Sequence, residues 1–161
     1  MFTAKRRVCS SVTDESIPSL LQNWIDGGDT AMSGSYRDIK AWQKAIELVV
    51  EIYSCTRNFP REKIYGLANQ LRRAAVSVAS NIAEGKGRRT DKEFLLFLHH
   101  ARGSVFEVET QLTIAGRLGY VTQAEVERIG NSAGEIARML NGLIKSIRCG
   151  VAETGSSEEA A

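Results

Sequence analysis

The chain has 161 residues, of which 43% are hydrophobic and 25% are charged, and its formal net charge is +2. These values are typical of one globular domain with its own core, and no apolar run approaches the ~20 residues of a membrane-spanning helix. Cys9, Cys55 and Cys149 are odd in number and far apart, which argues against a disulfide framework or a cysteine zinc site and makes a reducing cytoplasm the expected location.

The first 35 residues differ from the rest and are expected to form a poorly ordered N-terminal extension. Residues 16–25 have the spacing of a short amphipathic helix, and residues 33–35 indicate a flexible join to the remainder of the chain. Two interpretations remain open. In one, residues 1–31 derive from an upstream start codon and Met32 is the natural beginning; in the other, they form an accessory arm that contains Trp24.

A first helix is predicted from about Asp38 to Arg57, before Pro60, because proline disfavours helical geometry in the residue that precedes it. Large apolar residues recur along it at intervals of three and four and define the face expected to enter the core. These residues are Ile39, Trp42, Ile46, Val49 and Tyr53, with Val50 beside them.

A second helix is predicted to begin near Ile64, and Gly85 and Gly87 are expected to end it in the left-handed conformation. Its core stripe consists of Leu67, Leu71, Ala74, Val78 and Ile82. A second stripe of small residues lies beside the first and predicts that another helix approaches closely on a second side. It consists of Ala75, Ala79 and Ala83.

Two further helices are predicted, from about Asp91 to Leu118 and from about Gln123 to Arg148. Each begins at a capping box, Thr90–Glu93 and Thr122–Glu125, and Gly119 stops the third helix. The core stripe of the third helix is Leu95, Leu98, Ala101, Val105, Val108, Leu112 and Ala115. That of the fourth is Val126, Ile129, Ala133, Ile136, Leu140, Leu143 and Ile147.

Four amphipathic helices with mostly short connections predict an all-α fold. The expected architecture is an antiparallel up-down four-helix bundle over residues 36–148, with helices crossing at about 20°. Residues 149–161 contain mainly Ser, Glu, Ala and Gly, and we expect them to form a disordered tail.

The sequence offers no clear catalytic or metal-binding constellation, so we expect a protein that is not an enzyme and needs no metal or cofactor. His99 and His100 are adjacent, which points them about 100° apart on a helix, and neither has the Glu three residues earlier that a di-iron bundle requires. The segment Gly85–Gly87 lacks the strand and helix start of a phosphate loop.

The basic residues are the remaining signal. Residues 36–148 contain 18 basic and 12 acidic side chains, a net charge of +6, so the predicted bundle is more basic than the whole chain. Candidate nucleic-acid-binding residues are Arg72, Arg73, Lys86, Arg88, Arg89 and Lys92. One interpretation is a patch that contacts phosphates, with binding that is salt-sensitive and largely independent of sequence. The other is a solvated basic surface without a partner.

The segment Asn81-Ile82-Ala83-Glu84-Gly85 resembles the signature of the 23S rRNA intervening-sequence family of four-helix-bundle proteins. Residues 36–45 resemble the opening of that family, and residues 93–95 and 119–121 resemble its third helix and the turn after it. Within the signature, Asn81, Ile82, Glu84 and Gly85 are expected to act structurally, with Asn81 bonded to helix carbonyls and Glu84 paired with a basic residue of the next helix.

This resemblance implies a bacterial protein that forms a five-fold ring, and one branch is similar to the accessory variability determinant of diversity-generating retroelements, which binds nucleic acid and a reverse transcriptase. The expected function is a homopentamer that binds RNA or DNA; the alternative is a protein-binding scaffold. Two surfaces independently suggest self-assembly, because they exceed what one core needs. They are the alanine stripe of the second helix and, on the third, Phe94, Phe97 and Phe106.

Overall fold

A computed structural model describes residues 34–59 and 64–155. The expectations for residues 1–33, including the arm with Trp24, lie outside these residues. The elements are η1 (Tyr36–Asp38), α2 (Lys40–Cys55), η2 (Thr56–Asn58), η3 (Ile64–Ala68), α4 (Asn69–Lys86), α5 (Asp91–Arg117) and α6 (Gln123–Gly155). Every element in the described residues is helical, which confirms the predicted all-α class.

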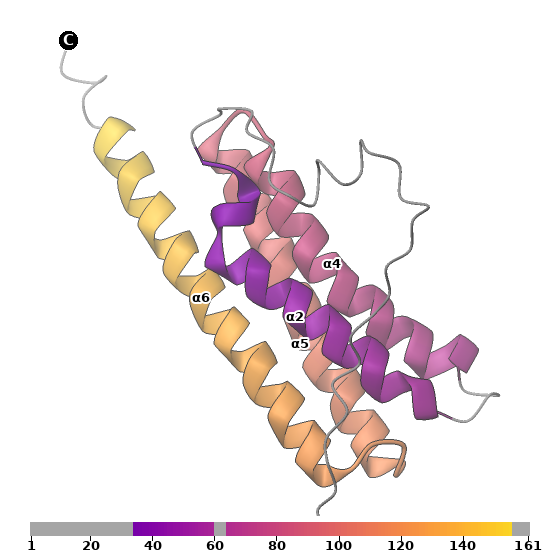
Figure 1. Cartoon of the computed structure of the whole chain (residues 1–161). Helices are drawn as coiled ribbons and strands as arrows, with labels where there is room; N and C mark the ends of the chain where they lie inside the picture. Colours follow the sequence, from indigo (N-terminus) through magenta and orange to yellow (C-terminus); the bar gives the residue numbers. More distant parts are fainter. Residues whose placement is uncertain (1–33, 60–63, 156–161) are drawn as a thin grey trace, which may run out of the picture. The chain divides into compact units, whose positions relative to one another are not determined.

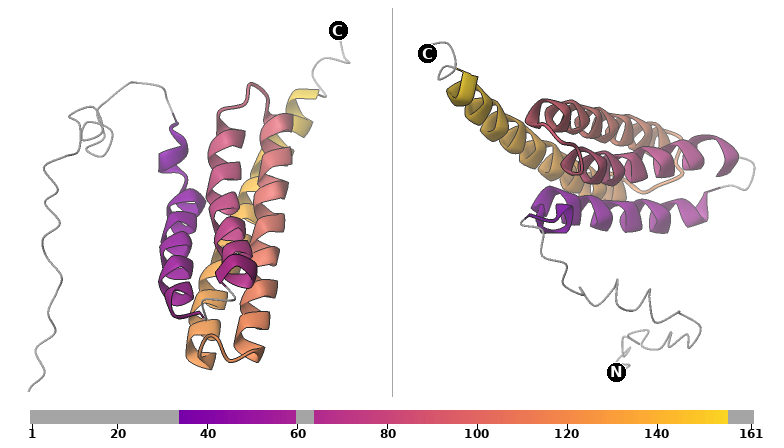
Figure 2. Two further views of the ribbon diagram at one scale, coloured as in Figure 1. Left: turned by 90° about the vertical axis from the view of Figure 1, so that its right-hand side faces the viewer. Right: turned by 90° about the horizontal axis from the view of Figure 1, so that it is seen from above.

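The four long helices form an up-and-down bundle, shown from three directions in Figures 1 and 2. Around the bundle, α2 lies against α4, α4 against α5, α5 against α6 and α6 against α2. The helices α2 and α5 therefore lie on one diagonal of the bundle, and their outer surfaces point away from each other. In the part of the chain that the structure describes, no helix has the length and apolar character needed to span a membrane.

The predicted starts of α5 and α6 and the predicted end of α5 are confirmed. The backbone N–H of Glu93 donates to Thr90 Oγ1 over 3.2 Å, and that of Glu125 donates to Thr122 Oγ1 over 3.3 Å. Gly119 has a φ of +71°, and the two N–H groups of Gly119 and Tyr120 donate back to the carbonyls of Gly116 and Ala115. This is the Schellman arrangement, in which a left-handed residue closes the end of a helix.

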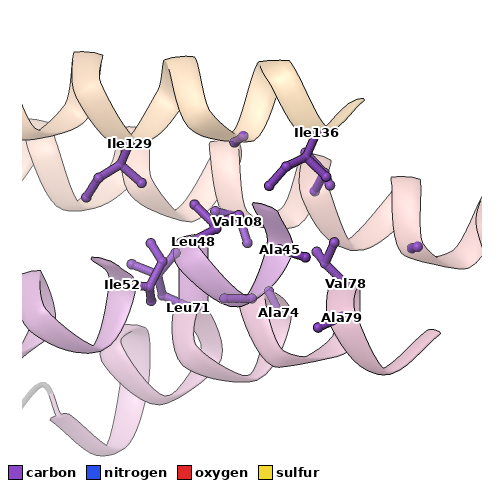
Figure 3. Close-up of a cluster of buried hydrophobic side chains, with 14 of the residues drawn as sticks. Ala45, Leu48, Ile52, Leu71, Ala74, Val78, Ala79, Val108, Ile129 and Ile136 are labelled. Atoms are coloured by element: carbon purple, nitrogen blue, oxygen red, sulfur yellow. The ribbon is translucent and has the colours of Figure 1, made fainter. Parts of the chain in front are cut away.

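Most of the predicted core stripes of α4, α5 and α6 are buried. Leu71, Val78 and Ile82 of α4 are fully enclosed, as are Leu98 and Leu112 of α5. Figure 3 shows the centre of this core, where Ile129 and Ile136 of α6 face Leu48 and Ile52 of α2. The remaining members are partly buried and pack against this core, namely Leu67, Leu95, Val126, Leu143 and Ile147.

The predicted core face of α2 is wrong for half of its residues. Exposed fractions are 40% for Ile46, 65% for Val50 and 44% for Tyr53. The side chains that enter the core belong to the neighbouring face, whose spacing is also four and three. They are Ala41, Ala45, Leu48, Ile52 and Cys55. A face that begins with two alanines lets α2 approach α4 and α6 more closely than a face headed by Trp42 would allow.

Three further expectations need correction. Ala75 and Ala79 of the second stripe are buried in the core of the single chain, and so is Phe94, so they leave no surface for a neighbour. Gly87 caps α4 with a φ of −78°, which is right-handed, and Gly85 lies inside the helix rather than beyond it. The last helix continues to Gly155, past the expected end at Arg148.

The start of the second long helix also differs from the prediction, which was a single helix that begins near Ile64. Residues 64–68 form the π-helical turn η3, and Gly66 interrupts it with a φ of −97° and a ψ of −107°. The regular helix begins only at Asn69.

Candidate nucleic-acid interface

The six predicted phosphate-binding residues do not form one patch. Arg72 and Arg73 lie near the start of α4, whereas Lys86 is its last residue and Arg88, Arg89 and Lys92 come after it in the turn and at the start of α5. At about 1.5 Å per residue, Arg72 and Lys86 are separated by about 20 Å along the axis. The two groups therefore belong to opposite ends of the bundle.

Arg72 has structural partners at its own end. Its Nε–H donates to Thr56 Oγ1 over 2.8 Å, and its guanidinium lies 5.1 Å from the centre of the Tyr53 ring. The Thr56 hydroxyl in turn donates to the carbonyl of Ile52 over 2.7 Å. These contacts connect the start of α4 to the end of α2, so Arg72 is less available to a ligand than its exposed neighbour Arg73.

The turn between α4 and α5 exposes four cationic side chains, those of Lys86, Arg88, Arg89 and Lys92. Arg88 is held in place, because it forms an ion pair with Glu84 and lies 4.6 Å above the Phe97 ring. Glu84 thus pairs within the turn rather than with the next helix as predicted. Among the described residues, Lys86, Arg89 and Lys92 have no carboxylate within ion-pair distance.

Two of the three acidic residues near this turn have partners, and the third is Asp91, which is exposed at the start of α5. Glu84 is bound to Arg88, and the Glu93 carboxylate accepts a hydrogen bond from the Thr90 hydroxyl over 2.8 Å. The side chains of Lys86, Arg89 and Lys92 are therefore the ones at this end of the bundle that remain able to meet phosphate groups.

Asn81, the first residue of the signature segment, connects α4 to α5. Its amide nitrogen donates to the Ser77 carbonyl over 2.8 Å and to Ser77 Oγ over 3.0 Å. Ser77 Oγ is 2.9 Å from Ser104 Oγ of α5, so a short polar chain crosses between the helices. Ser104 also donates to the His100 carbonyl over 3.1 Å.

Gly85, the last residue of the signature, permits the close approach of α5. A Cβ atom at this position would lie 2.6 Å from Phe97 Cβ and 2.9 Å from Phe94 Cδ2, both below van der Waals contact. Ile82, one turn earlier, is completely buried. The signature segment thus holds α4 against α5, and the turn between these two helices, called the basic turn below, carries the exposed cations.

Two apolar areas remain exposed on the described surface. The first, called the α2 face below, consists of Ile46, Val50 and Tyr53 of α2 with Val76 of α4. The second, called the α5 face, consists of Leu96, Phe106 and Ile114 of α5 with Leu118 just beyond it. Because α2 and α5 are diagonal, the two faces lie on opposite sides of the bundle.

The α2 face was not predicted from sequence, because its residues were assigned to the core. The missed signal was the second apolar stripe of α2, which runs from Ala41 to Cys55 at the same intervals. Of the three phenylalanines assigned to a possible interface, only Phe106 is exposed; Phe94 is buried and Phe97 is partly buried.

No group of three or more potential metal ligands occurs within residues 34–59 and 64–155. His99 is partly buried, and this burial together with the charges of Arg102 and Arg148 lowers its pKa. The His100 ring lies 6.0 Å from that of Phe97, edge to face.

Comparison with protein families gives a match over residues 37–142 to the family described as 23S rRNA-intervening sequence protein. Among solved structures, the chain is similar to a protein of unknown function from the S23 ribosomal protein family of Bacteroides thetaiotaomicron. The two share 26% identity with a TM-score of 0.61, and the likeness covers 65% of this chain and 95% of the other. Comparison with curated proteins gives no match.

Proposed function

The chain belongs to the 23S rRNA-intervening sequence protein family, and we propose that it assembles with copies of itself and binds RNA or other nucleic acid without catalysing a reaction. The observation that supports assembly is the pair of apolar faces on opposite sides of the bundle. The observation that supports nucleic-acid binding is the turn between α4 and α5, where Lys86, Arg89 and Lys92 have no carboxylate partner in the described residues.

The position of the two apolar faces favours a head-to-tail contact. Val50 is 65% exposed and Phe106 is 50% exposed, and large apolar side chains of this kind are the residues that a contact with another copy would bury. When two different faces of one protein meet, each copy offers one face to each neighbour, and the chain of contacts closes into a ring if the rotation permits. The family resemblance makes a pentamer the expected ring.

Assembly would strengthen a weak nucleic-acid contact. One basic turn offers three available cations, so a single copy makes few phosphate contacts. A ring repeats the turn in every copy, and linked contacts to one polyanion raise the overall affinity through effective concentration. Binding of this kind is expected to weaken steeply with salt and to depend little on sequence.

Assembly can be tested with two charged substitutions in the full chain. Val50→Glu should disable the α2 face and Phe106→Glu the α5 face, and each variant should sediment as a monomer of 17.7 kDa. A mixture of the two should yield a heterodimer, because each partner retains the face that the other has lost. Lys40→Glu, at an exposed position at the start of α2 and off the stripe of Ile46 and Val50, is the control and should assemble like the unmodified chain.

Two outcomes would contradict this account. A wild-type chain that stays monomeric at high micromolar concentration removes assembly altogether. If Val50→Glu blocks assembly but Phe106→Glu does not, the contact joins two α2 faces, and the result is a two-fold dimer rather than a ring.

Nucleic-acid binding can be tested by fluorescence anisotropy with a labelled structured RNA over a salt series. Arg89→Ala and Lys92→Ala should each weaken binding to all sequences alike and lower the salt slope by about one. Arg117→Ala is the matched control, since Arg117 is exposed at the opposite end of α5. Weak binding that does not change with salt would reject the nucleic-acid role.

The second candidate is a scaffold that docks another protein, such as a reverse transcriptase, and has no direct contact with nucleic acid. The same exposed apolar faces favour it, because a partner protein could cover them as well as a second copy could. The tests described above distinguish the two candidate functions. The scaffold predicts a monomer without salt-dependent RNA binding, whereas the proposed function predicts an assembly that binds RNA.

A further inference from the structure

The boundary between α5 and α6 contains a basic groove whose residues were not among the candidates chosen from sequence. One wall is Arg102 of α5, and the other is formed by Asn141, Lys145 and Arg148 of α6. The depression has a volume of about 380 Å³, and Ile144 and Cys149 also line it. Arg102 and Arg148 are 46 positions apart in the sequence, and only the antiparallel packing of α5 on α6 brings them together.

The charge of this groove is less compensated than that of the α4–α5 turn. Three of the six residues that line it are cationic, namely Arg102, Lys145 and Arg148, and none is Asp or Glu. Neither Arg102, Lys145 nor Arg148 has a carboxylate within ion-pair distance among the described residues. Lys145 and Arg148 are exposed, so an anion can reach them from solvent.

Arg102 is already oriented toward the groove. Its Nη1 donates to Asn141 Oδ1 over 2.9 Å, which fixes the guanidinium against α6. A guanidinium has five N–H donors, and this bond uses one of them, so the others can still reach phosphate oxygens. A group held in place by a neighbour loses less conformational entropy when it binds a ligand.

The groove and the basic turn are both reached from α5. Lys92, His99 and Arg102 succeed one another at intervals of seven and three, so they lie on one side of this helix. At about 1.5 Å per residue, Lys92 and Arg102 are about 15 Å apart along the axis, with the exposed side chain of Leu96 between them. A nucleic-acid backbone that contacts the turn can therefore reach the groove within a few nucleotides.

We propose that the groove formed by Arg102, Lys145 and Arg148 binds backbone phosphates of the nucleic acid and continues the contact made at the basic turn. This inference rests on the proposed nucleic-acid role and assigns it a second set of residues. The cations come from two helices and line an open groove, which suits a polymer that lies along it. The groove recognises the phosphates of the nucleic acid rather than its bases, because none of the residues that line it is aromatic and able to stack on a base.

His99 is placed to respond to the charges of the groove. Its pKa is lowered by burial and then by Arg102, Arg148 and His100, and no carboxylate opposes them. A phosphate in the groove would offset these positive charges and raise the pKa of His99. Binding should therefore take up a proton, and affinity should increase as the pH falls through the range in which histidine titrates.

Cys149 allows the groove to be probed directly. It is exposed at the rim, whereas Cys55 is buried and burial raises its pKa to about 11, so only Cys149 should react rapidly with iodoacetamide. The full-length Cys9→Ser variant removes the thiol that lies outside the described residues. With a single-stranded RNA oligonucleotide at ten times its Kd, the alkylation rate of Cys149 should fall by about tenfold.

Substitutions then assign the contacts. Lys145→Ala and Arg148→Ala should each lower the salt slope of RNA binding by about one, and Arg102→Ala should do the same. Arg138→Ala is the matched control on α6, because Arg138 is exposed and outside the groove. Far-ultraviolet circular dichroism would confirm that each variant folds, and His99→Gln should flatten the pH dependence of RNA binding.

The outcomes separate this inference from the proposed function. If the wild-type chain binds no RNA, the proposed function fails. If RNA binds and Arg89→Ala weakens it, but the groove variants bind normally and Cys149 is not protected, the groove assignment alone is overturned. Protection of Cys149 together with a reduced slope in the three groove variants supports it.

Discussion

The helices α2 and α4 lie side by side, and they place their apolar residues differently. On α4 the strongest apolar stripe enters the core, so Leu71, Val78 and Ile82 are fully buried. On α2 the core receives a stripe that begins with Ala41 and Ala45, while Ile46 and Val50 remain in water. The largest apolar side chains of a helix thus need not be its core, and on α2 those left outside form the surface on which the proposed assembly rests.

The largest expected effect is on the free energy of unfolding, and it distinguishes the buried face of α2 from its exposed face. Leu48→Ala removes a buried side chain and leaves a cavity, so the free energy of unfolding should fall by about 2–5 kcal/mol. Val50→Ala changes a side chain that is 65% exposed and should leave that quantity nearly unchanged. Urea denaturation at concentrations where the chain is monomeric measures both. Equal losses in the two variants would show that Val50 is part of the core.

The next effect concerns the close approach of α4 and α5. Gly85→Ala places a methyl group against Phe97 and Phe94, and overpacking of this kind should cost about 1–3 kcal/mol of unfolding free energy. Gly103→Ala is the matched control, because no atom lies within 4 Å of its added Cβ. That control should raise stability by up to about 1 kcal/mol through helix propensity. A stabilised Gly85→Ala variant would contradict the close-packing role.

A smaller effect is expected where α4 meets α5 through polar side chains. Asn81→Leu removes the two hydrogen bonds to Ser77 and should reduce the unfolding free energy by about 1 kcal/mol. Ser80→Ala, at an exposed position of the same helix, should change little. Thermal unfolding with sedimentation on the same samples tests whether the loss extends to assembly. Unchanged melting and unchanged particle size would mean that Asn81 has no structural role.

The smallest effect concerns Cys55, the last buried residue of α2. Burial raises the pKa of its thiol to about 11 from the usual 9.0. The folded chain therefore keeps the proton while the unfolded chain releases it, and stability should fall as the pH rises from about 9 to about 11. Comparison of this pH dependence with that of Cys55→Ala isolates the thiol. Parallel curves for the two chains would show that the thiol is not desolvated.

Part of the candidate site was predictable from sequence. The exposed positions of Lys86, Arg89 and Lys92 result from Gly87, which caps α4, and from the capping box that opens α5, both of which are local signals. The sequence could not show that Arg72 is bound to Thr56, because that contact depends on where α2 ends relative to α4. The sequence also could not show that Arg102 and Arg148 line the same groove, because that depends on how α5 packs on α6.

The sequence by itself determined the four helices, the capped starts of α5 and α6 and the core stripes of α4, α5 and α6, because periodicity and capping depend on residues within a few positions of one another. Only the tertiary structure decided which of the two apolar stripes of α2 is buried. Both stripes have helical spacing, so the choice depends on how closely α4 and α6 approach, and a close approach selects Ala41 and Ala45 over Ile46 and Val50.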